Sequence, residues 1–337
     1  MIHLRTYKNS MSVPTCGTAQ AEEYNIGVRR ITTEVAGIEA PVRVFYPTHE
    51  SEAETRFGPW ELSVARNSAP ASGHFPLIAI SHGLSGNDWN HHLLASRLVK
   101  AGFVVAAVRH PDDLLRVGQP EITVLRPREL TAAIDAVLTD SRFGPIVDAE
   151  RIGAFGFSLG GFTVLVVAGG RIEYEKIARH CSNAEKDPEY CIGEEGGEPL
   201  PMWLRARRLI YSIPQVDLTE DVLDPRIDAI VAAAPVGLPF NDLSRVQMPV
   251  LLHRAGSDHS LRAPYHAENV HKLLPEAHRY EVIGNLHHYA FLSPFPDSIT
   301  AEVGEPAQDP SGFDRSLFLD EINDEIVDFF RENLIRK

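Results

Sequence analysis

A serine flanked by glycines stands in the segment GAFGFSLGGF, residues 153–162. Gly156, Ser158 and Gly160 form the pattern G-x-S-x-G, which is short enough to occur by chance, so its setting decides its meaning. The apolar run before the serine is typical of a buried strand, and the run after it is typical of a helix. A sharp strand-to-helix turn would place the hydroxyl at the positive end of the helix dipole. The pattern therefore predicts Ser158 as a nucleophile, and a purely structural glycine turn is the alternative.

A serine hydroxyl is a poor nucleophile at neutral pH unless a base removes its proton and a third group orients that base. On a scaffold with this serine motif, the acid and then the histidine follow the serine along the chain. Asp258, in RAGSDHSL, directly follows the apolar run PVLLHRAG, so it would lie at the carboxyl end of a parallel strand. We expect Asp258 to be the acid. Asp242 is the second candidate, and a turn or helix-cap role is the alternative for Asp258.

Two adjacent histidines are candidates for the base. His287 and His288 follow the last predicted core strand, in EVIGNLHHYAFLSP, from which an imidazole can reach back across the edge of the sheet. Adjacent side chains cannot both point at Ser158. We expect His288 to be the base and His287 to be a supporting or surface histidine.

Hydrolysis through a serine also needs donors for the oxyanion of the tetrahedral intermediate. The segment SHGLSG, residues 81–86, follows the first long apolar strand, where loops of this kind contribute one backbone N–H. The residue after the nucleophile contributes the other. The sequence predicts the backbone N–H groups of Leu84 and Leu159 as the oxyanion hole, with His82 bracing the turn.

The sequence predicts neither a metal ion nor a cofactor. His91 and His92 are neighbours on a predicted helix and would point about 100° apart, and no H-x-x-x-H or H-E-x-x-H pattern occurs in the chain. The chain also lacks G-x-G-x-x-G after a strand and G-x-x-x-x-G-K-[ST], so dinucleotide and P-loop sites are not expected.

Near-continuous apolar runs alternate with helical patterns over most of the chain. The runs begin at residues 75, 103, 151, 227, 248 and 278, and such runs are typical of strands buried on both faces of a parallel sheet. Helical stripes include Leu130, Ala133, Ile134, Val137 and Leu138, and later Leu319, Ile322, Ile326, Phe329 and Phe330. A hairpin is expected at 26–47. The alternation predicts an α/β fold with a doubly wound, mostly parallel sheet.

The domain is expected to span residues 26–334, after an N-terminal extension at 1–25. Residues 170–226 interrupt the alternation and are expected to form a lid above the edge of the sheet. Met202, Trp203 and Leu204 in this insertion would form either an apolar acyl wall or an ordinary lid core. The proline-rich segment 293–313 is expected to be a second loop, too long for a passive connection.

Bulk properties narrow the choice of partners. The 337-residue chain has 32 basic and 46 acidic side chains, and its net charge of -14 would repel phosphate backbones, so we expect no nucleic-acid partner. No apolar run approaches the ~20 residues of a membrane span. The N-terminal region lacks the apolar segment of a signal peptide, which favours a cytoplasmic location. Cys181 and Cys191 are spaced so that they could either form a disulfide or remain free thiols.

On these residues the chain resembles the α/β-hydrolase superfamily, and more narrowly the predicted dienelactone hydrolase and platelet-activating factor acetylhydrolase group. The resemblance rests on ISHGLSGNDWNHHLLASRLVKAGFVVAAVRHPDD, GFSLGGFTV and NLHHYAFLSP, and it places His288 on the family's histidine and His287 where a glycine is usual. Dienelactone hydrolases use a cysteine nucleophile, whereas this chain has Ser158. The acetylhydrolases place their acid where this chain has Ala234 and Pro235, so their phospholipid specificity is not carried over.

The resemblance implies an α/β-hydrolase fold and a serine hydrolase that cleaves small or medium acyl esters through an acyl-enzyme. A small-molecule ester is the expected partner, and the oligomeric state is not predicted. A serine peptidase or amidase on the same scaffold is one alternative. A binding protein that has the fold without catalysis is the other.

Overall fold

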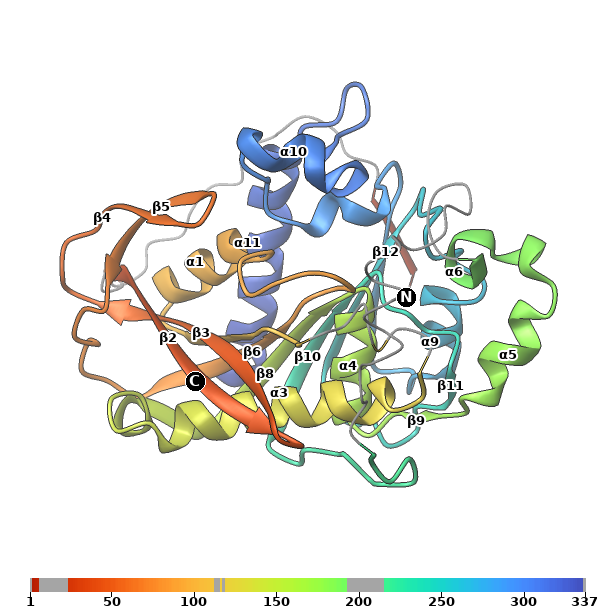
Figure 1. Ribbon diagram of the computed structural model, residues 1–337, viewed down its shortest axis with the longest axis horizontal. Helices are drawn as coiled ribbons and strands as arrows, with labels where there is room; N and C mark the ends of the chain where they lie inside the picture. The colour runs from red at the N-terminus through yellow and green to blue at the C-terminus, as the bar shows by residue number, and fades with distance from the viewer. Residues whose placement is uncertain (1, 6–23, 112–115, 117–118, 193–214, 336–337) are drawn as a thin grey trace.

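The computed structural model describes residues 2–5, 24–111, 116, 119–192 and 215–335 (Figure 1). Eleven of the described strands form one sheet in the order β1-β13-β12-β10-β8-β6-β7-β3-β2-β5-β4. Their bounds are β1 (Ile2–Arg5), β2 (Asn25–Val35), β3 (Ile38–Thr48), β4 (Ala53–Phe57), β5 (Trp60–Arg66), β6 (Phe75–Ser81), β7 (Val104–Val108), β8 (Val147–Phe157), β10 (Ile227–Ala233), β12 (Val250–Ala255) and β13 (Arg279–Ile283). A separate antiparallel pair is formed by β9 (Arg171–Ile172) and β11 (Phe240–Asp242).

Strands from β1 to β7 in this order run parallel to their neighbours. At the other end, β3 runs antiparallel to β7, and β2 and β3 form an antiparallel hairpin. All residues of β6 and β7 are buried, as expected for parallel strands covered on both faces. In the second half of β2, partly buried and exposed residues alternate, as expected where one face of the sheet is open to solvent.

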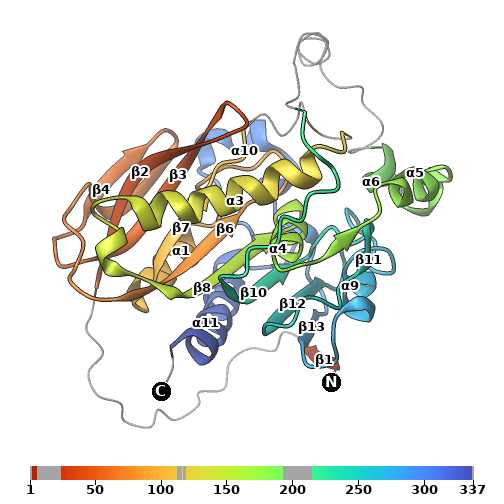
Figure 2. The same cartoon turned by 90° about the horizontal axis from the view of Figure 1, so that it is seen from below.

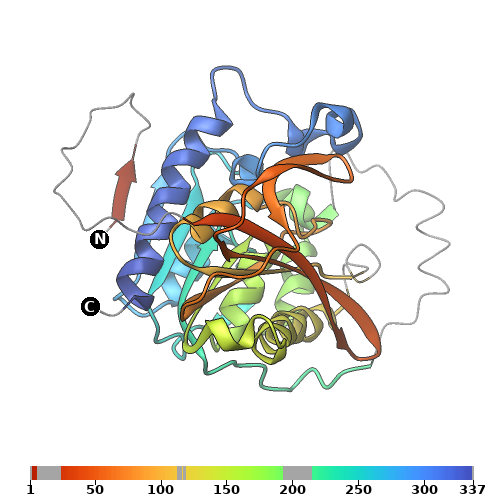
Figure 3. The ribbon, with the colours of Figure 1, turned by 90° about the vertical axis from the view of Figure 1, so that its left-hand side faces the viewer.

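Helices cover both faces of the sheet. The α-helices among the described residues are α1 (His92–Lys100), α3 (Ile122–Thr139), α4 (Leu159–Val167), α5 (Glu175–Cys181), α6 (Pro188–Ile192), α9 (Ala267–Leu273), α10 (Asp297–Val303) and α11 (Arg315–Leu334), and the 3₁₀ turns used below are η2 (Ala184–Lys186), η3 (His288–Phe291) and η4 (Glu305–Ala307). One buried apolar cluster joins α3, α4 and α9 to the sheet, and a second joins α1 and α11 to its other face. The end-on view in Figure 3 shows α11 and α3 on opposite sides of the sheet.

The structure confirms a mixed α/β architecture with a large, mostly parallel sheet. Each of the six predicted core strands is present, as are the early hairpin and the two helices whose apolar stripes predicted α3 and α11. The strands β4 and β5 were not predicted; most of their residues are exposed or only partly buried, so they lack the apolar runs of the core strands. Residues 2–5 of the predicted extension pair with β13.

Regular structure lies both in the segment predicted as a loop and in the insertion predicted as a lid. The segment 293–313 holds α10 and η4, so the prediction of a loop is wrong there; neither element has a buried residue, so neither has an apolar stripe in the sequence. The insertion at 170–226 holds β9, α5, η2 and α6 in its first part. Figures 1 and 2 place α5 and α6 beside β11 and α9. The proposed acyl-wall residues Met202, Trp203 and Leu204 lie outside the described residues, so the lid stays a prediction.

The two insertion cysteines form a disulfide between Cys181 and Cys191. The loop that this bond closes carries Asp187, which is fully buried and accepts a hydrogen bond from His266 Nε2 at 2.9 Å. Gly237 N–H donates to His266 Nδ1, which fixes the proton of the neutral ring on Nε2. The contact ties the insertion to the segment just before α9.

Among the described helices, none combines the length and the apolar composition that crossing a bilayer requires.

A buried histidine next to the sheet should make the fold acid-sensitive. His91, just before α1, packs edge-on against Phe155 and Phe157 and hydrogen-bonds the backbone of Phe291. Burial lowers its pKa from 6.5 to about 3. Below about pH 6.5, His91 is protonated in the unfolded chain but stays neutral in the folded chain. The free energy of unfolding should therefore fall as pH decreases.

Asparagine retains a hydrogen-bond donor but does not titrate. We therefore expect His91→Asn to reduce the pH dependence of the free energy of unfolding by about 1.4 kcal/mol per pH unit between roughly pH 6 and pH 4. Urea unfolding of the wild type and of His91→Asn at several pH values in this interval measures the difference in pH dependence. Equal slopes for the two proteins would show that His91 does not resist protonation.

Candidate active site

Ser158 lies at the junction of β8 and α4, with φ 55° and ψ −116°. A positive φ is unfavourable for a residue with a Cβ and persists only where the surroundings enforce it. Here Ser158 N–H donates to the Ala233 carbonyl at 2.9 Å, and Val236 N–H donates to the Ser158 carbonyl at 3.0 Å. The end of the neighbouring strand β10 and the residues just after it therefore hold the turn that presents the hydroxyl.

The flanking glycines are required by close backbone approaches. A Cβ on Gly160 would lie 1.9 Å from the Ser81 carbonyl oxygen, and a Cβ on Gly156 would lie 2.0 Å from the Gly160 carbonyl oxygen. Real Cβ atoms do not approach so closely, so no other residue fits either position without moving the backbone. The G-x-S-x-G pattern thus reflects the packing of α4 against β8 and the loop after β6.

Three side chains that are distant in the sequence form one hydrogen-bonded chain. His288, at the start of η3, places Nε2 3.0 Å from Ser158 Oγ and Nδ1 2.8 Å from Asp258 Oδ2. A carboxylate can only accept, so Nδ1 carries the proton of the neutral ring and Nε2 is free to accept the Ser158 hydroxyl proton. The side chains of His288 and Asp258 are 4% and 5% exposed, and Ser158 is 8% exposed. This is the arrangement needed to deprotonate a serine.

Asp258 makes both contacts that the sequence left as alternatives, one to a turn and one to the histidine. Its Oδ1 accepts the backbone N–H of Leu261 at 2.8 Å, as a turn aspartate does, while Oδ2 faces His288. The turn fixes the carboxylate, so the imidazole is oriented by a group that cannot itself rotate freely. The second candidate, Asp242, instead accepts the backbone N–H of Ser244.

His287 faces away from the serine. Its ring packs edge-on against Phe313, with Nε2 3.7 Å from Asp309 Oδ1. Burial, followed by the charge of Arg315, lowers its pKa. The structure therefore brings His288, and not His287, to Ser158.

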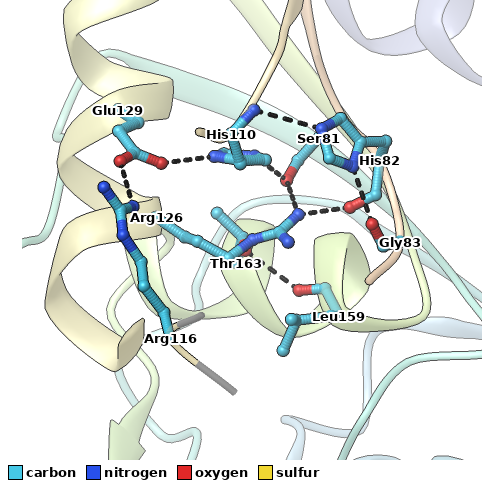
Figure 4. A network of polar contacts seen from close by, with 9 residues as sticks. All are labelled: Ser81, His82, Gly83, His110, Arg116, Arg126, Glu129, Leu159 and Thr163. Atoms are coloured by element: carbon cyan, nitrogen blue, oxygen red, sulfur yellow. Dashed lines mark hydrogen bonds and ion pairs between the residues drawn. The ribbon is translucent and has the colours of Figure 1, made fainter. Parts of the chain in front are cut away.

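The loop that follows β6 runs beside the nucleophile, since a Cβ on Gly83 would lie 3.5 Å from Ser158 Cβ. His110 N–H donates to His82 Nε2 at 3.1 Å, so the proton of the neutral His82 ring lies on Nδ1, which donates to the Gly83 carbonyl at 2.6 Å (Figure 4). Burial, followed by the charges of His110 and Arg126, holds the pKa of His82 well below 6.5. Neutral His82 thus braces the turn, as its position in the sequence indicates.

This brace sets the direction of the next N–H. The peptide bond between Gly83 and Leu84 is trans, so its N–H and C=O point in opposite directions. With the Gly83 carbonyl fixed on His82, the Leu84 N–H points away from that ring. The N–H of Leu159, the first residue of α4, has no acceptor within its own helix.

One buried guanidinium joins the loop to α4. Arg126, on α3, is fully buried and donates to the His82 carbonyl, to Ser81 Oγ at 3.3 Å and to Thr163 Oγ1 at 3.2 Å (Figure 4). Thr163 Oγ1 in turn donates to the Leu159 carbonyl at 2.9 Å. The two segments that carry the Leu84 and Leu159 N–H groups are therefore held by the same side chain.

The network extends to a buried carboxylate. His110 Nδ1 donates to Glu129 Oε2 at 2.7 Å, and Arg116 donates to Glu129 Oε1 at 2.5 Å. Ser81 Oγ completes the set by donating to His110 Nε2 at 2.8 Å. Burial raises the pKa of Glu129 against the opposing effect of Arg116, and burial lowers the pKa of His110 well below 6.5.

The sequence patterns do not predict this network. Arg126 stands four residues before Leu130, and so on the apolar stripe that predicted α3. A charge on an apolar stripe signals a buried polar contact, but the partners of Arg126 come from β6, the loop after β6 and α4, and only the folded chain brings them together. Asp187 and His266 were missed for the same reason.

A scan against models of known protein families finds no match to this chain, and a search of curated proteins likewise finds none.

Proposed function

We propose that this protein is a serine hydrolase that cleaves carboxylic esters through an acyl-enzyme. The observation that carries the proposal is the hydrogen-bonded chain from Asp258 through His288 to Ser158. Its order along the sequence, with the serine first and the histidine last, agrees with the resemblance to α/β hydrolases, as does a nucleophile placed after a central parallel strand.

In the first half of the reaction, Ser158 Oγ attacks the ester carbonyl carbon while His288 Nε2 takes the hydroxyl proton. Asp258 stabilises the imidazolium that forms. Collapse of the tetrahedral intermediate breaks the bond to the alcohol, which leaves with the proton from His288. The acyl group stays on Ser158.

In the second half, His288 Nε2 takes a proton from water, and the hydroxide attacks the acyl carbon. The second tetrahedral intermediate releases the carboxylic acid, and His288 returns the proton to Ser158 Oγ. No metal ion or cofactor is needed for this cycle.

The N–H groups of Leu84 and Leu159 are the proposed donors to the oxyanion. Both are set before substrate binds, one by the brace on the Gly83 carbonyl and one by the start of α4. Donors already in place lower the barrier because they need not reorganise as charge develops.

A small or medium acyl ester is the proposed substrate. A serine peptidase or amidase would use the same three side chains, so substrate panels must separate the two. A binding protein without catalysis would be favoured by the histidine at 287 where the family has glycine. His287 packs against Phe313 and away from Ser158, so it does not obstruct the nucleophile.

Labelling of the nucleophile tests the proposal directly. A fluorophosphonate probe should label the wild-type protein at Ser158 and fail to label Ser158→Ala, and that variant should lose about 10⁶-fold in kcat on p-nitrophenyl esters. Aminoacyl anilides should react far more slowly than the esters. Anilides as the better substrates would favour the peptidase, and an unlabelled wild type would favour a binding protein.

The acid is tested by Asp258→Asn. An amide in place of the carboxylate favours the wrong tautomer of His288, so kcat should fall about 10⁴-fold while the fold is retained. His287→Ala is the matched control and should change kcat little, because its ring faces Asp309 and Phe313. Full activity in Asp258→Asn would require another acid, and Asp242→Asn would then be the next variant.

Arg126→Met tests the link between the two oxyanion donors. Methionine fills similar space but cannot donate to the His82 carbonyl, so we expect kcat to fall about 10- to 100-fold with a much smaller change in KM. Arg128→Met is the control, because Arg128 lies on the same helix and pairs with Glu220 at the surface. Thermal unfolding curves of both variants identify an assay temperature at which each variant is folded. An equal loss in the two variants would argue against a role for Arg126 in positioning the donors.

A further inference from the structure

A second group of ionisable side chains lies between the sheet and α11. His253 on β12 and Glu281 on β13 are register partners, so their side chains project from the same face of the sheet. Glu325 on α11 packs against that face, and its carboxylate comes within 4.8 Å of ligand atoms of the other two. No member of this cluster is part of the hydrogen-bonded chain at Ser158.

Within the described part of the chain, neither ring nitrogen of His253 makes a hydrogen bond, although the side chain is fully buried. Its Nε2 is 3.6 Å from Glu325 Oε1. A buried polar atom without a partner costs about 1–3 kcal/mol, so an imidazole aimed between two carboxylates calls for an explanation.

The two carboxylates are nearly buried. Glu281 is 8% exposed, and the Glu325 side chain is 12% exposed. Arg279 donates to Glu281 at 3.2 Å and to Glu325 at 3.3 Å, but its own side chain is 46% exposed and can turn outward. Burial alone would raise the pKa of Glu325, yet its contacts with His253, Glu281 and Arg279 lower it below its ordinary value. Glu325 is thus ionised at neutral pH.

We propose that His253, Glu281 and Glu325 bind one divalent first-row transition-metal ion such as zinc. An imidazole nitrogen with two carboxylate oxygens suits zinc and its neighbours, whereas calcium and magnesium prefer oxygen ligands alone. Ligands of a tetrahedral zinc lie roughly 3.4 Å apart, so atoms within 4.8 Å of one another need only small side-chain rotations to close on the ion. Water would fill the fourth position.

The ion would join three elements. It would link β12, whose end leads to Asp258, with β13 and with α11, and it would give His253 a partner. The sequence predicts no metal site because the three ligands come from separate elements and form no short motif. The proposal is independent of the ester hydrolase activity, since its readout is metal binding.

Titration of tag-free, EDTA-dialysed protein with zinc chloride tests the site. Calorimetry should show one zinc ion per chain, and zinc should raise the Tm of the wild type. Cobalt(II) should give visible absorption bands typical of a coordinated ion. Glu325→Gln should weaken zinc binding by at least about tenfold and abolish the Tm shift. Glu321→Gln, an exposed glutamate one turn earlier on α11, should bind zinc as the wild type does.

Arg279→Gln provides a second variant at a partly exposed position. Arg279 neutralises the same carboxylates, so its removal should tighten zinc binding severalfold. If the wild type binds no zinc at one equivalent, or if Glu325→Gln binds it equally well, the proposal fails and the cluster is an ion-pair cluster only. Weaker binding in Arg279→Gln would also overturn it.

Discussion

The backbone at Ser158 is the constraint on which the site depends. A positive φ at a residue with a Cβ must be enforced from outside, and the hydrogen bonds to Ala233 and from Val236 do so from the neighbouring strand. The same turn leaves room only for glycine at 156 and 160. The central parallel strands thus act as a rigid support, and the hydroxyl points where a histidine from a later strand can reach it.

Electrostatic interactions hold the loop after β6 and the start of α4 in one conformation. His82 and His110 are neutral because burial disfavours their charged forms, so each ring has a fixed donor and a fixed acceptor. Arg126 supplies the charge that holds the His82 carbonyl and, through Thr163, the first turn of α4. A network in which each of these polar contacts is made specifies one loop conformation, which is what a preformed oxyanion hole requires.

A different group of ionisable side chains lies on the face of the sheet that α11 covers. There His253 lies between two carboxylates and hydrogen-bonds none of the residues that the structure describes, on the strand that leads to Asp258. The turn at Leu261 therefore holds Asp258, which follows β12, and in our proposal an ion holds β12 along its length. The disulfide loop of the insertion anchors the chain after Asp258 through His266. The disulfide loop, and in our proposal the ion, restrict the backbone around Asp258.

The sequence by itself determined the α/β class, the positions of the core strands and helices, and the residues Ser158, Asp258 and His288 as candidates. It could do so because burial on both strand faces, helical periodicity and the glycine-serine turn are local patterns. The choice of His288 over His287 and of Asp258 over Asp242 depended on the direction in which each side chain points, and the structure supplies that direction. Only the tertiary structure decided the Arg126 network, the Asp187–His266 contact and the His253 cluster, because their members come from separate elements and meet only when the sheet and its helices pack together.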